Sequence, residues 1–136
     1  FFLLAPSRLD LLPTLRSRSL SVFLGPAENA NVAEVEPVAR AFTAAVSAFA
    51  STGAAIHLLA AAEALGRAGG WEDPRASRPW AVAASAVLQS LDSAGGRRRA
   101  LLALSEDLLG APLLRLRGVG VERILEGLVA RHLAPE

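Results

Sequence analysis

Alanine and leucine dominate this chain and supply 28 and 24 of its 136 residues. Both are strong helix formers, because neither is branched at Cβ and each loses little side-chain freedom in a helix. Residues that favour strands are scarce by comparison, with 10 Val, 2 Ile and 3 Thr. Small Ala side chains also let two helices approach closely, while Leu fills the space between them. The composition therefore predicts an all-α fold.

Glycine and proline divide the sequence into helical segments, which we expect to form a compact bundle or a short array of about five to six helices. Asn31 or Glu36 precedes the first turn, and Pro37 suits the first helical position. Gly53 either makes a tight turn or lies within one long helix. Apolar residues three and four apart predict helices over about 38–52, 54–68, 79–94, 97–109 and 121–133, with a short turn after Pro112.

The same spacing predicts which side of each helix faces the core. The residues expected to point inward are Val38, Phe42, Val46 and Phe49, then Ile56, Leu59, Ala62 or Glu63, and Leu65, then Trp80, Ala84, Val87, Leu88 and Leu91, then Leu101, Leu104 and Leu108, and finally Val121, Ile124, Leu125 and Leu128.

Residues 1–26 differ from the rest and are interpreted as an extended arm before a single helical domain over 27–136. Three prolines prevent a long helix in the arm. Phe1 and Phe2 make an apolar end, so they are candidate interface anchors. The arm has three Arg and one acidic residue up to residue 24, a composition typical of organellar transit peptides. It is either an ordered extension held against a partner or a targeting remnant, and it favours an organelle, the mitochondrion before the plastid.

The missing residue types exclude most enzyme chemistry. All 14 basic residues are Arg, and the chain has no Cys, Lys, Met or Tyr. Disulfides, thiolate nucleophiles, Cys-ligated zinc, Schiff-base lysines and phosphate-loop lysines are therefore excluded. The two histidines are expected to be structural, with His57 in the core and His132 at the end of the last helix. We predict no catalytic site, no cofactor and no metal.

The sequence Leu116-Arg117-Gly118-Val119-Gly120 resembles the hairpin of the helix-hairpin-helix family, whose pattern is leucine, proline, glycine, hydrophobic, glycine. The resemblance implies that backbone amides around Gly118 and Gly120 bind nucleic-acid phosphate without reading sequence. Arg117 replaces the usual proline, and Ile124 stands where the second helix of the family has a small residue. The alternative interpretation is a glycine-rich turn between two helices.

Arg97, Arg98 and Arg99 form a basic run at the start of a predicted helix, where cations oppose the helix dipole. With Arg115 and Arg117 they are candidate contacts for a partner or for phosphate. Residues 74–136 carry 9 Arg and 6 acidic residues, whereas residues 25–73 carry 2 Arg and 6 acidic residues. This uneven distribution favours docking between charged proteins, while a solvated face remains the alternative.

Two other features bear on partners. Residues 38–62 are long enough to cross a bilayer and hold one Arg and one His, but they are rich in Ala, Ser, Thr and Gly. They are either a buried helix or a membrane span. Trp71 and Trp80 lie at the two ends of a polar loop. They either pin this loop to the core or act as interface anchors themselves.

Together these features favour a non-enzymatic helical accessory or scaffold subunit of a larger multi-protein assembly. A mean hydropathy of +0.38 indicates apolar surface that an interface would cover. The first alternative is an RNA-binding helical protein, such as an organellar ribosomal component, and the second is a single-span subunit of a membrane complex.

Overall fold

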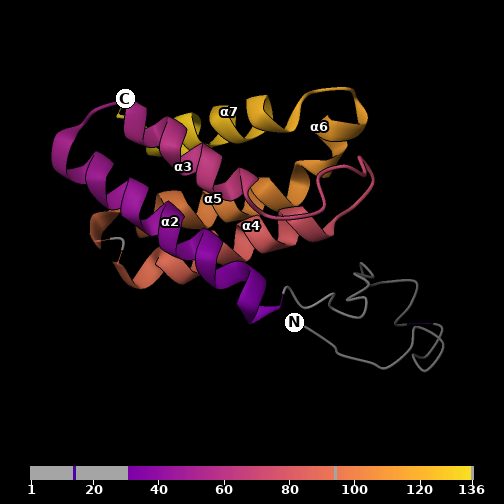
Figure 1. The fold of residues 1–136 in the computed structure, drawn as a ribbon, viewed down its shortest axis with the longest axis horizontal. Coiled ribbons are helices and arrows are strands. Elements are labelled where there is room, and N and C mark those ends of the chain that lie inside the picture. Colours follow the sequence, from indigo (N-terminus) through magenta and orange to yellow (C-terminus); the bar gives the residue numbers. More distant parts are fainter. Residues whose placement is uncertain (1–13, 15–30, 94, 136) are drawn as a thin grey trace.

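The computed structural model describes residues 14, 31–93 and 95–135 of the chain and confirms an all-α fold. Five helices of 11 to 21 residues account for most of these residues, which contain no strand (Figure 1). They are α2 (Val32–Thr52), α3 (Ile56–Gly66), α4 (Arg78–Gln89), α5 (Arg98–Gly110) and α7 (Val121–Leu133), with the short helix α6 (Pro112–Leu116) and the 3-10 turns η2 (Ser90–Ser93) and η3 (Gly95–Arg97) between them.

The five long helices form a closed ring. Helix α2 packs against α3 and α4, α3 also packs against α7, and α5 joins α7 to α4 (Figure 1). In a helical array each unit touches only its neighbours in sequence. Here α3 and α7 are far apart in the chain and lie side by side. Of the two architectures that the sequence allowed, the fold is therefore the compact bundle.

Large side chains from every helix of the ring fill its interior. Phe42, Leu65, Leu101, Leu104 and Leu108 are completely buried, as are Val87 and Val129, while Trp80 is 2% exposed. The inward faces predicted for α2 and α5 are confirmed, because Val38, Val46 and Phe49 are buried as well. Burying one such side chain contributes about 1.5–3 kcal/mol to folding, so the ring is held together mainly by this core.

Helix α3 faces the core with alanine rather than with its larger residues. Ala61, Ala62 and Ala64 are buried beside Leu65. The prediction that Ile56 and Leu59 point inward is wrong, because they are 64% and 50% exposed. The small side chains let α3 approach α2 and α7 closely, and Leu65 is the large side chain that α3 contributes to the core. Helix α4 uses Ala83, Ala84 and Ala86 in the same way, and its Leu88 is exposed.

Helix α2 begins earlier than Pro37 suggested. Asn31 is the N-cap, and its side-chain oxygen accepts a hydrogen bond from the amide of Ala33 at 3.2 Å. Pro37 therefore lies inside the helix, where it cannot donate to the carbonyl of Ala33. Ala33 is exposed, so water can satisfy that carbonyl, and the proline is tolerated close to the helix start.

The start of α2 is tied to the start of α4 by an ion pair. Nη2 of Arg78 donates to both carboxylate oxygens of Glu34 at 2.7 Å. This hydrogen-bonded guanidinium lowers the pKa of Glu34 from its ordinary value. Both side chains are about half exposed, so the pair sets the register of the two helices more than it stabilises them.

Residues 38–62 are not one continuous helix. Gly53 has a φ of 69° and donates its amide to the carbonyl of Phe49 at 2.8 Å, which ends α2 with a left-handed cap. The chain then reverses and α3 begins at Ile56. Within the part of the chain that the structure describes, no helix has the length and apolar character needed to cross a membrane.

Candidate functional site

Helix α5 ends at Gly110, and the short helix α6 begins at Pro112 after a turn at Ala111. Ala111 itself keeps helical dihedral angles, with φ −65° and ψ −23°. Pro112 has no amide to donate, and the amides of Leu114 and Arg115 bond to the carbonyl of Ala111 at 2.9 and 3.3 Å. Helix α6 is therefore a separate short helix, and none of its residues is buried.

Helices α5 and α6 carry four exposed leucines, which we call the leucine face. Leu102 and Leu109 lie seven residues apart on α5, and Leu113 and Leu116 lie three residues apart on α6. The opposite side of α5 holds the buried Leu101, Leu104 and Leu108. The exposed fractions are 41% for Leu102, 59% for Leu109, 66% for Leu113 and 57% for Leu116. Exposed apolar side chains that gather on a surface mark interaction sites in soluble proteins.

Charged residues border the leucine face in an ordered way. Arg98 and Arg99 precede Leu102 by four and three residues, so they lie one turn away at one end. Arg117 follows Leu113 by four residues at the other end, and Glu106 lies between Leu102 and Leu109. All four charged side chains are exposed. Glu106 is four residues after Leu102 and three before Leu109, so its negative charge interrupts the leucine face on α5, and arginines precede and follow the face in sequence.

Arg97 does not belong to this border. Its guanidinium lies over the ring of Phe49, 5.0 Å from the centroid, and its Nη1 donates to the carbonyl of Leu133 at 3.4 Å. These contacts join the start of α5 to the last turns of α2 and α7. The three arginines are adjacent in sequence, but the structure separates Arg97, which has an internal role, from the exposed Arg98 and Arg99.

This separation predicts different effects on stability. Replacing Arg97 with Gln should lower the free energy of unfolding by about 1 kcal/mol, because a cation–π contact and a charged hydrogen bond are lost. The double change Arg98→Gln and Arg99→Gln should leave stability unchanged or slightly higher, since both cations oppose the dipole of α5. Urea denaturation of the two variants measures the difference. Equal losses in both would contradict the internal role of Arg97.

The turn between α6 and α7 is closed by its own hydrogen bonds. Gly118 has a φ of 87°, and its amide donates to the carbonyl of Arg115 at 3.0 Å. The amide of Val119 donates to the carbonyl of Leu114 at 3.3 Å. This pair of bonds is a Schellman cap. The geometry is thus that of a glycine-rich turn between helices, in which the Gly118 amide is bonded within the turn, while phosphate binding at this hairpin stays a prediction. Gly120 is the N-cap of α7, with extended dihedral angles.

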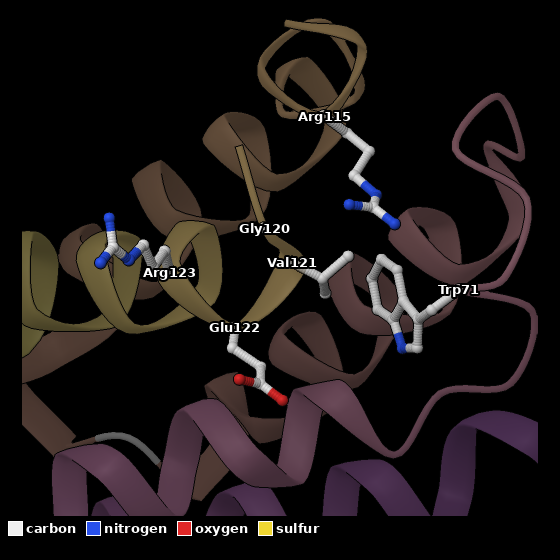
Figure 2. A pocket seen from close by; sticks show the side chains of 6 residues that line it. All are labelled: Trp71, Arg115, Gly120, Val121, Glu122 and Arg123. Carbon is white, nitrogen blue, oxygen red and sulfur yellow. The ribbon is translucent and has the colours of Figure 1, made fainter. Parts of the chain in front are cut away.

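A pocket of about 560 Å³ lies beside this turn (Figure 2). Arg115 reaches from α6 towards Trp71 and Val121, while Arg123 points away from it along α7. The Nε atom of Arg115 is buried and has no hydrogen-bond partner. Glu122 also lines the pocket, so the lining carries both signs of charge. The structure therefore places Arg115 in this pocket, away from the leucine face.

The two tryptophans meet edge to face at the end of α3. Their ring centroids are 4.8 Å apart, with an angle of 85° between the planes. Nε1 of Trp71 donates to the carbonyl of Gly66 at 2.9 Å. Trp80 is only 2% exposed and belongs to the core, whereas Trp71 is partly buried and forms one wall of the pocket. The sequence suggested that the two tryptophans either pin the loop between them to the core or act as interface anchors. Their contacts are those of residues that pin the loop.

No protein-family model matches this chain, and no curated protein or solved structure matches it either. The exposed leucines of α5 and α6 are the surface feature that indicates an interaction site.

The histidines lie apart from the leucine face. Nε2 of His132 is 2.7 Å from Oδ2 of Asp107, which links α7 to α5. His57 is half-buried in the first turn of α3 instead of lying in the core. Within residues 31–93 and 95–135, no three His, Asp or Glu side chains gather as metal ligands would.

The predictions for the arm lie outside the described residues. They concern Phe1 and Phe2 as interface anchors, residues 1–26 as an extended arm and the organellar location. All of these stay predictions.

The sequence analysis did not single out the leucine face. It predicted a separate short turn after Pro112, which is the helix α6 that carries Leu113 and Leu116. The exposure of Leu102 and Leu109 on the outer side of α5 follows from the packing of Leu101, Leu104 and Leu108 on its inner side.

Proposed function

We propose that this chain is a non-enzymatic helical accessory subunit that joins a larger multi-protein assembly through its leucine face. The observation that carries the proposal is the row of four exposed leucines on α5 and α6. The ring of helices already has a filled core on the other side of the same segment. These leucines therefore serve nothing inside the described fold, and an interface is the feature that would bury them.

The border of the leucine face supports a protein partner. Protein interfaces typically have an apolar centre that excludes water and a polar rim that includes Arg. Leu109 and Leu113 occupy the centre here, while Arg98, Arg99 and Arg117 lie at the rim. Burial of apolar surface is the main favourable term in such association, and the rim charges steer and orient the partner.

The alternatives have less support. For RNA binding, the Gly118 amide is already bonded and Arg97 is directed inward, so two of the seven predicted phosphate contacts are used inside the fold. The single-span alternative required one long helix over residues 38–62, but the chain reverses at Gly53 within this range. The exposed Arg98, Arg99 and Arg117 would suit phosphate, but exposed leucines between them would not.

The experiment compares two leucines of similar exposure. Leu109 is 59% exposed within the leucine face, and Leu59 is 50% exposed on α3, outside it. In cells that make this protein, the tagged wild-type chain should elute from a size-exclusion column with a large complex. Leu109→Asp should shift it to the size of the free chain, because a carboxylate cannot be desolvated in an apolar interface. Leu59→Asp should leave the complex intact.

Two results would contradict the proposal. One is a complex that survives Leu109→Asp, and the other is a wild-type chain that elutes as a free monomer. Release of the chain by ribonuclease, with Leu109→Asp still bound, would favour the RNA alternative.

A further inference from the structure

We propose that the pocket beside the turn between α6 and α7 binds a small organic carboxylate, whose charge pairs with Arg115 and whose apolar body packs against Trp71. Both residues line the pocket, and its volume of about 560 Å³ is within the range of ordinary small-molecule sites. None of the four leucines of the leucine face lines it. The site is therefore independent of the proposed function.

Arg115 carries a positive charge that the described residues do not pair. Its guanidinium reaches from α6 towards Trp71 (Figure 2), and it forms no ion pair with the described residues. Its Nε atom is buried and has no hydrogen-bond partner. Buried nitrogen atoms are nearly always hydrogen-bonded, because an unpaired one costs free energy. Arg115 is therefore a residue of the pocket with both charge and a donor left for a ligand.

The other charged residues of the lining favour a ligand with a single negative charge. Figure 2 shows the carboxylate of Glu122 directed away from Arg115, and Arg123 pointing away along α7. A ligand beside Arg115 would thus meet one cation, with a carboxylate on the same lining. A phosphate carries nearly two charges at neutral pH, so Glu122 would repel it more strongly. A carboxylate carries one charge and matches the planar fork of a guanidinium.

Apolar side chains supply the rest of the binding surface. Trp71 is held by the hydrogen bond from its Nε1 to the carbonyl of Gly66 at 2.9 Å and by its edge contact with Trp80. Val121 lies close to it in Figure 2 and is half-buried. A side chain that is already fixed loses little conformational freedom when a ligand binds. The body that carries the carboxylate is therefore apolar, and an aromatic ring can pack against the indole.

The start of α7 adds to the preference for an anion. Gly120 is the N-cap of α7, offers no side-chain hydrogen bond, and lines the pocket together with Val121. The positive end of the helix dipole favours a nearby negative group by a modest amount. This contribution is secondary, since a helix start alone does not select a ligand. Arg115 and Trp71 carry the proposal.

The test titrates the full chain with phenylacetate, which has one aromatic ring and one carboxylate. Phenylacetamide has the same shape without the charge, and phenyl phosphate has a more highly charged anion. Two-dimensional amide NMR spectra follow the indole N–H of Trp71 and the backbone amides of Val121 and Glu122. We expect saturable shifts at these groups and a Kd of about 1 mM, an ordinary value for a ligand of about ten heavy atoms. Phenylacetamide should bind about tenfold more weakly, and phenyl phosphate should also bind more weakly than phenylacetate.

Three variants of the chain test the roles of the charged residues. Arg115→Gln should weaken phenylacetate binding about tenfold and remove the preference over phenylacetamide. Arg117→Gln is the matched control, because Arg117 is an exposed arginine near the same turn that does not line the pocket. Glu122→Gln leaves Arg115 intact and should strengthen binding about twofold, since it removes a like charge. None of the three residues is buried, so each variant should keep the wild-type circular dichroism spectrum and melting transition.

Several results would overturn the proposal. They are equal affinity for phenylacetate and phenylacetamide, tighter binding of phenyl phosphate, shifts that do not saturate, unchanged binding by Arg115→Gln, and weaker binding by Glu122→Gln. Leu109→Asp should bind phenylacetate as the wild type does. Loss of the native complex in Leu109→Asp therefore tests the proposed function separately from this site.

Discussion

Replacing Trp80 with alanine is expected to lower the free energy of unfolding by about 3–5 kcal/mol. The side chain is 2% exposed and lies in the central cluster of the ring. Its removal leaves a large cavity that the surrounding helices can fill only in part, and it also removes the edge-to-face contact with Trp71. Domains of this size are stabilised by about 5–15 kcal/mol in total, so this variant loses a large share of its stability.

Urea denaturation followed by circular dichroism measures this effect. Leu116→Ala is the control, because Leu116 is 57% exposed and its truncation should change stability by less than about 0.5 kcal/mol. A Trp80→Ala variant that unfolds at the wild-type urea concentration would show that the tryptophan is not part of the core.

Removing α7 is expected to abolish cooperative unfolding. A chain that ends at residue 119 lacks the four buried side chains of α7, which are Ile124, Leu125, Val129 and Leu133. Each contributes about 1.5–3 kcal/mol, and together they are comparable to the stability of the whole domain. The loss also opens the faces of α3 and α5 that α7 covers. Thermal melting monitored by circular dichroism should then show a broad, non-cooperative change.

The result of this deletion distinguishes a closed ring of helices from a linear helical array. In an array the loss of the last unit removes one interface and leaves the remaining units able to unfold cooperatively. In the ring it breaks the contacts of α7 with both α3 and α5. Leu125→Asp is the matched point variant, because it keeps the chain length and buries a carboxylate in the core. A sharp transition near the wild-type midpoint in both variants would contradict the ring.

The sequence predicted the helices well where their periodicity was strong. In helices α2 and α5 the large apolar residues recur three or four positions apart, which places them on one side of the helix. Phe42, Val46, Leu101 and Leu104 were therefore assigned to the core correctly. Helix α3 is apolar on nearly every side, so periodicity could not distinguish its faces. The choice between Leu59 and Ala61 was decided by how closely α2 and α7 approach, which is a tertiary property.

The candidate site was less predictable. Arg97, Arg98 and Arg99 are identical in type, but Arg97 ends the 3-10 turn η3 and is directed inward, whereas Arg98 and Arg99 begin α5 and are exposed. The glycines marked the turn at Gly118 correctly. Whether its amide was free depended on a hydrogen bond to Arg115 that composition does not reveal. Pro112 correctly indicated a break between α5 and α6.

The lack of any buried residue in α6 has a consequence for dynamics. Its backbone hydrogen bonds can open without disturbing the core, so its amides exchange with solvent through local fraying. Amides of α5 and α7 that lie over the core exchange only when the whole ring opens. Half of the leucine face, Leu113 and Leu116, therefore lies on a segment that can open locally. A partner bound at these leucines would protect the amides of α6 from exchange, and its binding energy would include the ordering of α6.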